Sequence, residues 1–69
     1  MRISARNQLR GKVLEVKKGQ TTAHVRVSIG GNAIITSSIT NEAVDELGIK
    51  AKGLVTVVIK ASDVMIAVD

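Results

Sequence analysis

Apolar and polar residues alternate one by one between Ala23 and Ile29. A period of two is typical of a β-strand with one buried face and one polar face. Leu9–Val16 shows a weaker form of the same pattern, which Gly11 interrupts, so we expect a bulge or bend there. Gly19 and Gln20 separate the two segments, and this spacing predicts a β-hairpin.

Three further apolar segments read as strands. Gly30–Asn32 forms a turn signal that leads into a strand at Ala33–Ile39. Leu54–Lys60 and Val64–Val68 are predicted as the last two strands, and Ala61–Asp63 joins them. The pattern therefore predicts five strands in all.

One segment, Asn41–Leu47, reads as a helix. Thr40 suits the N-cap position. Acidic residues such as Glu42 stand in the first turns, where their negative charge interacts favourably with the helix dipole. The apolar residues of the segment share one face. Gly48 suits the position just past the end of a helix.

The order of the elements predicts the fold class. Five strands with one short helix between strands three and four define an all-β protein, an OB-like β-barrel. A small swapped-hairpin β-barrel is the alternative. Residues 1–69 form a single predicted domain, since no linker or low-complexity tract divides them. The longest apolar run is Val64–Val68, too short to cross a membrane, and no signal peptide is visible, so we expect a cytoplasmic protein without membrane contact.

The composition excludes several ways of stabilising so small a domain. The chain has 69 residues and contains no cysteine, proline or aromatic side chain. Disulfides and thiolate metal sites are therefore excluded, and no bulky aromatic core can form. Ordering the chain costs roughly 1.5 kcal/mol per residue. With disulfides, metal sites and an aromatic core excluded, burial of surface between subunits is the remaining way to offset this cost. We expect a homo-oligomer.

The charge is concentrated near the N-terminus. Residues 1–18 contain six lysines and arginines against one acid, Glu15, whereas the whole chain has a net charge of +4. Nucleic acid, an anionic surface or a small anion could each match this charge. Base stacking on aromatic rings is worth about 1–3 kcal/mol per base and is absent here, so we expect no nucleic-acid partner. A small basic β-barrel that binds nucleic acid, and a pure assembly module, are the alternatives.

Residues suited to catalysis are scarce. A nucleophile–base pair would need the only histidine, His24, which stands in the middle of the polar face of a predicted strand. The acids of the helix are explained by its dipole. Gly30 and Gly31 precede a strand rather than a helix, so they do not form a phosphate loop. The sequence predicts that the protein is not an enzyme.

Three local features favour a small anion. Ser4 and Arg6 share one side of an extended segment. Thr40 opens a helix whose first N–H groups lack partners, and Ala43 is too small to crowd an oxyanion there. Lys60–Ser62 combines an ammonium, backbone N–H groups and a hydroxyl. The ordinary alternatives are a solvated Arg6, a plain N-cap at Thr40 and a surface Lys60.

Three ordered blocks also carry a family resemblance. Ile3–Leu9, followed by Gly11–Val13, resembles the N-terminal signature of molbindin, the small molybdate-binding Mop domain. Ile35–Thr40 is similar to that family's central strand and helix start, and Val57–Ala67 to its C-terminal hairpin. The resemblance covers nearly the whole chain.

The resemblance implies an OB-like barrel assembled as a homohexamer, a trimer of dimers. Molybdate or tungstate would be held at subunit interfaces, without an organic cofactor or a directly bound metal. The implied function is intracellular storage and homeostasis of molybdenum. Carried over by position, the side-chain ligands of the oxyanion fall on Ser4, Arg6, Thr40 and Lys60, with helping backbone N–H groups near Ala5, Ala43 and Ala61. Related regulators have a serine in place of Ala43, so only a backbone donor remains there.

Overall fold

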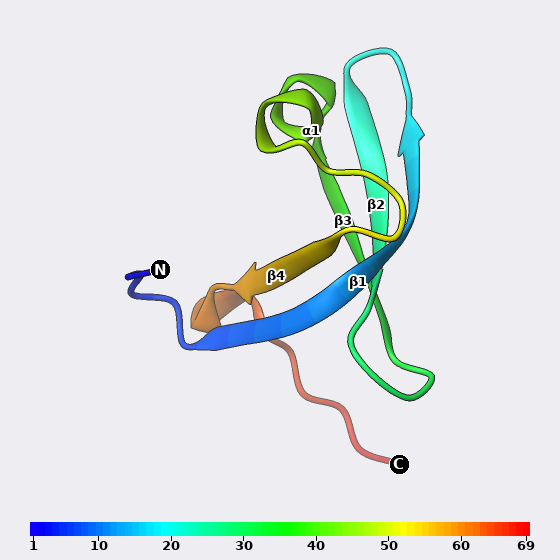
Figure 1. Ribbon diagram of the computed structural model, residues 1–69. Coiled ribbons are helices and arrows are strands. Elements are labelled where there is room, and N and C mark those ends of the chain that lie inside the picture. Colours follow the sequence, from blue (N-terminus) through cyan, green and yellow to red (C-terminus); the bar gives the residue numbers. More distant parts are fainter.

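The computed structural model describes residues 1–69 as one antiparallel sheet with a single short helix (Figure 1). The elements are β1 (Asn7–Lys18), β2 (Thr22–Ser28), β3 (Ile34–Thr40), α1 (Asn41–Leu47), β4 (Leu54–Ile59) and a 3₁₀ turn, η1 (Ala61–Asp63). The sheet has four strands in the order β3-β2-β1-β4. The predicted class is confirmed as a mostly β fold, with the helix between strands three and four. The curved sheet forms half of a barrel.

The length and bend of β1 create the curvature, because this strand pairs with β2 along one half and with β4 along the other. The register with β2 shifts between Val13 and Glu15, two residues beyond the position that the sequence suggested. Gly11 has a different role. A Cβ atom there would lie 2.5 Å from Cγ1 of Val27 and 2.7 Å from the carbonyl oxygen of Ser28. The two strands can approach this closely only because position 11 has no side chain.

Substitution of Gly11 by alanine should therefore destabilise the sheet. The added methyl group must push against a backbone carbonyl, and overpacking of this kind costs about 1–3 kcal/mol. Urea denaturation should show a lower midpoint than for Gly19→Ala, whose nearest contact is 3.1 Å, to the carbonyl oxygen of Thr22. Equal midpoints for the two variants would contradict this account of Gly11.

The core is small and lies on the concave face of the sheet. Only five residues are fully buried: Val13, Ala23, Val25, Val27 and Val44. Val44 belongs to α1, which covers one end of this face (Figure 1). No helix in the structure has the length and apolar character that a membrane span requires.

The helix begins and ends where the sequence predicts. The hydroxyl oxygen of Thr40 accepts a hydrogen bond from the Ala43 N–H at 3.0 Å, and Gly48 adopts a left-handed conformation with φ of 64°. Lys18, at the end of β1, pairs with Asp45 of the helix at 2.6 Å. The side-chain amide of Asn41 also donates to the Gly19 carbonyl at 3.0 Å. These contacts fix α1 to the β1–β2 hairpin.

The predicted fifth strand, Val64–Val68, does not form within the chain, so the prediction of a five-stranded barrel in one subunit was wrong. β4 ends at Ile59, and η1 turns the following residues away from the sheet (Figure 1). Met65 and Ile66 are 92% and 86% exposed. A strand needs a neighbouring backbone, and this segment has none in its own subunit. β3 and β4 are left as free edges.

Candidate functional site

An open hollow of about 670 Å³ lies where the N-terminal segment meets the end of β4. We call it the basic hollow. Five of the seven residues expected to bind an anion line it together: Ser4, Ala5, Arg6, Lys60 and Ala61. Its other lining residues are Ile3, Val58, Ser62 and Asp63. Two segments that are distant in sequence therefore converge on one site.

The register between β1 and β4 produces this convergence. Asn7 pairs with Ile59, so the next step outward brings Arg6 beside Lys60. Like charges in such cross-strand positions are destabilising unless something neutralises them. The only ion pair of the structure joins Lys18 to Asp45, at the other end of β1. Neither Arg6 nor Lys60 has a carboxylate partner, so the basic hollow has two uncompensated cations.

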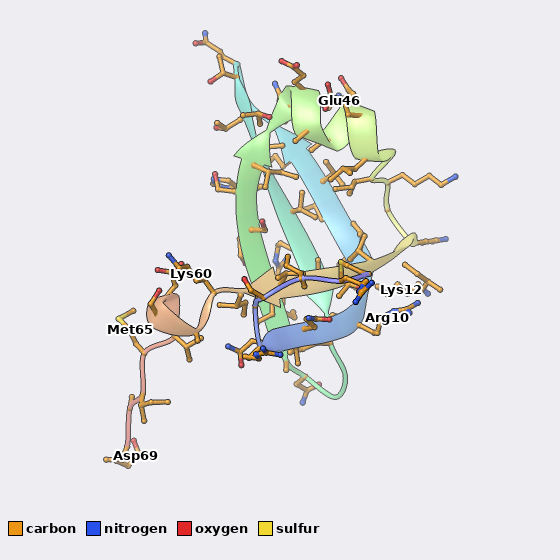
Figure 2. The ribbon with its side chains drawn as sticks, turned by 90° about the vertical axis from the view of Figure 1, so that its left-hand side faces the viewer. Arg10, Lys12, Glu46, Lys60, Met65 and Asp69 are labelled. Carbon is orange, nitrogen blue, oxygen red and sulfur yellow. The ribbon has the colours of Figure 1, made fainter.

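The η1 turn adds backbone donors beside Lys60. The Asp63 N–H donates to the Lys60 carbonyl at 2.9 Å, and the Val64 N–H donates to the Ala61 carbonyl at 3.3 Å. The first N–H groups of a helical turn, here those of Ala61 and Ser62, have no partner within it. Figure 2 shows Lys60 next to this turn, well away from Arg10 and Lys12. The hydroxyls of Ser4 and Ser62 complete the set of possible donors.

Ser62 and Asp63 are lining residues that the family resemblance does not assign. The sequence pattern did mark the Ser62 hydroxyl, because it directly follows the Lys60–Ala61 pair. Asp63 could not be found in this way, since an acid is not expected among anion ligands. It is the one acidic side chain that lines the basic hollow. An anion must therefore bind nearer to Arg6 and Lys60 than to this carboxylate.

Thr40 and Ala43 do not line the basic hollow of their own subunit. They belong to the start of α1, which Figure 1 shows at the opposite end of the sheet from η1. The N–H of Ala43 is already bonded to the Thr40 hydroxyl oxygen. A single chain thus brings together two of the three predicted anion-binding elements.

A second surface feature is an apolar groove of about 200 Å³ on the concave side. Its lining is mainly apolar and comes from β2, β3, β4 and the end of the helix: Val25, Val27, Ser37, Ile39, Leu47, Ile49, Val55, Thr56, Val57 and Val58. Both free edge strands of the sheet, β3 and β4, contribute to this lining. Elsewhere, no group of three or more histidine or acidic side chains is placed to hold a metal ion.

Comparison with known proteins identifies the class and then the family. A model described as the TOBE domain matches residues 3–66, so the chain is a TOBE-domain protein. It is 54% identical over 66 residues to molybdenum-pterin-binding protein 1 of Clostridium pasteurianum, covering 96% of this chain and 97% of the relative. The chain belongs to the molybdenum-pterin-binding Mop family, also called molbindins, which confirms the resemblance. Membership of this family of binding proteins also confirms that the protein is not an enzyme.

Solved structures of this family have the same fold. MopII from Clostridium pasteurianum superposes with a TM-score of 0.90 at 51% identity, covering 97% of this chain and 100% of that one. A molybdate-binding protein from Sporomusa ovata gives a TM-score of 0.91 at 30% identity, covering 97% and 98%. The cytoplasmic molybdate-binding protein ModG, solved with molybdate bound, gives 0.90 at 45% identity, covering 94% of this chain and 46% of ModG.

Proposed function

We propose that this protein binds molybdate or tungstate as an intact oxyanion and serves intracellular storage and homeostasis of molybdenum. The observation that carries the proposal is the pair of uncompensated cations, Arg6 and Lys60, in a hollow lined by hydroxyls and backbone N–H groups. The relatives described as molybdate-binding proteins support the choice of anion. The description of ModG as cytoplasmic supports the same setting for this chain.

The chemistry of the donors explains the preference for such an anion. Molybdate at neutral pH is a dianion with oxygen acceptors on every side and no proton. Arg6, Lys60 and the neighbouring N–H groups can give it charge-assisted hydrogen bonds, which are the strong ones. Hydrogenphosphate has a proton that needs an acceptor. An anion held against Arg6 and Lys60, away from the Asp63 carboxylate, would leave this proton unpaired, which costs about 1–3 kcal/mol for a buried group. Sulfate has no proton, so size must separate it from molybdate.

A neighbouring subunit would complete the site. We place Thr40 of a second copy against the basic hollow, because a single chain leaves this N-cap far from Arg6. Its hydroxyl oxygen accepts from the Ala43 N–H, so the hydroxyl proton is free to donate to an oxyanion. In this arrangement the Ala43 N–H orients the Thr40 hydroxyl and does not itself contact the anion. The oxyanion would lie at a subunit interface.

The fifth strand of the barrel would also come from a second copy. Val64–Val68 is apolar and exposed, and it leaves its own sheet (Figure 2). The apolar groove would provide an apolar surface for the side chains of this segment. The free edges of β3 and β4 would provide unpaired backbone groups for its main chain. Exchange of the segment between two copies would close two five-stranded barrels. Three such dimers would form the hexamer that the family resemblance implies.

Calorimetric titration of the anion-free protein tests the proposal. We expect saturable, tight binding of molybdate and much weaker binding of sulfate and phosphate. The bound anion should also stabilise the fold, by about 2.7 kcal/mol at a ligand concentration of one hundred times Kd. Absence of molybdate binding would overturn the proposal. Oligonucleotide titration at several salt concentrations would then separate a nucleic-acid-binding module from a pure assembly module.

A further inference from the structure

Two side-chain amides tie down the backbone next to the basic hollow, although neither residue lines it. Nδ2 of Asn7 donates to the Ile59 carbonyl at 3.2 Å, across 52 residues of sequence. Nε2 of Gln8 donates to the Ala5 carbonyl at 3.0 Å. The first bond joins the two segments that form the hollow, and the second fixes the shape of the N-terminal segment.

The Asn7 bond lies at the point where both cations leave the sheet. Asn7 is the first residue of β1 and directly follows Arg6, whereas Ile59 is the last residue of β4 and directly precedes Lys60. Strand ends open easily, and repulsion between Arg6 and Lys60 would favour opening here. A cross-strand hydrogen bond at this position opposes that separation.

Burial makes Asn7 the more important of the two amides. Asn7 is half-buried, whereas Gln8 is exposed to solvent. Water competes more effectively with an exposed hydrogen bond, so the Gln8 contact contributes less. The Asn7 contact also spans two strands, so its loss would change the separation of the cations.

We propose that Asn7 is a positioning residue of the oxyanion site: its amide holds Arg6 and Lys60 at the spacing that an oxyanion requires. This inference rests on the proposed function. The residue acts by preorganisation, because the free protein already holds the donors close together and little ordering is needed when the anion binds. It makes no contact with the anion itself.

The test compares Asn7→Ala with the parent protein in calorimetric titrations with molybdate and with sulfate. Without this bond, binding of the anion must itself bring the two cations together. The cost is at most the roughly 0.5–1.5 kcal/mol that such a bond contributes, so the molybdate Kd should rise by up to about two- to twelvefold. The preference for molybdate over sulfate should fall as well, because a looser pair of cations discriminates size less well. Asn7→Leu, close in size to asparagine, provides a second variant should the alanine protein fail to fold.

Val13→Ala is the control for a general loss of stability. Val13 is buried in the core and lines neither the basic hollow nor the apolar groove. This variant should melt at a lower temperature and keep the parent's molybdate Kd. In an Arg6→Ala background, Asn7→Ala should cause no further loss of affinity.

The outcomes separate this inference from the proposed function. A parent protein that binds no molybdate refutes the proposed function. A parent that binds molybdate, together with Asn7 variants of unchanged Kd and unchanged preference over sulfate, overturns the role of Asn7 alone. An equal loss of affinity in Val13→Ala also overturns that role, since global stability would then explain the effect.

Discussion

Replacement of Arg6 by alanine is expected to abolish tight molybdate binding and to leave the sheet folded. Hydrogen bonds to a charged group contribute about 1.5–3 kcal/mol, so Kd should rise about ten- to 150-fold for each bond lost. The stability of the anion-free protein should not fall. Arg6 is exposed, has no ion-pair partner and lies beside Lys60, so its removal relieves a repulsion between like charges.

Arg10→Ala is the matched control for this experiment. Arg10 is an exposed arginine four residues further along the chain, within β1, but it does not line the basic hollow (Figure 2). Thermal unfolding with and without molybdate should show a large ligand-induced stabilisation for the parent and for Arg10→Ala, and little for Arg6→Ala. Lys60→Ala should behave like Arg6→Ala. Parent-like affinity in either hollow variant would show that the site is assigned to the wrong residues.

The sequence predicted the local structure well because the signals for it are local. Alternation around Val25 marked β2, and Thr40 with Gly48 marked both ends of the helix. Side chains within four residues of each other decide these features. Gly11 was recognised as unusual, but its cause, contact with Val27 across the sheet, lies sixteen residues away and could not be read from the pattern.

The meeting of Arg6 with Lys60 depends on strand register. Their cross-strand position requires that β1 and β4 pair with Asn7 opposite Ile59, and a slip of one residue would turn one cation to the other face. Local residues around Arg6 do not encode this register. The family resemblance supplied the grouping, and the structure supplies its geometry. The place of Thr40 is different, because a single chain does not bring it to the hollow at all.

The prediction of a strand at Val64–Val68 was wrong within the chain for a related reason. The apolar content of this segment favours its burial, but it does not show which surface would bury it. The turn at Ala61–Asp63 was expected to return the chain to its own sheet, and it instead directs the segment outward. A pattern of hydrophobic residues shows that a segment favours burial. Under the exchange proposed above, a second copy would provide the surface that buries it.

Ile66→Asp should therefore prevent assembly. In a strand, Val64, Ile66 and Val68 share one face, which would fill the apolar groove of the second copy. Burial of an isoleucine side chain contributes about 1.5–3 kcal/mol, and an unpaired carboxylate in an apolar site costs more than that. Because two segments would be exchanged, each dimer is affected twice. Sedimentation equilibrium should show a parent oligomer and a dissociated variant with little molybdate binding.

Leu14→Asp provides the control for this prediction. Leu14 is 45% exposed on the central strand β1, and it lies outside the apolar groove, the free edge strands and the C-terminal segment. The same new charge at position 14 should leave the oligomer intact. An Ile66→Asp protein that keeps the parent's mass would contradict the exchange of the segment. Since Thr40 of a second copy would complete the oxyanion site, loss of assembly and loss of molybdate binding should occur in the same variant.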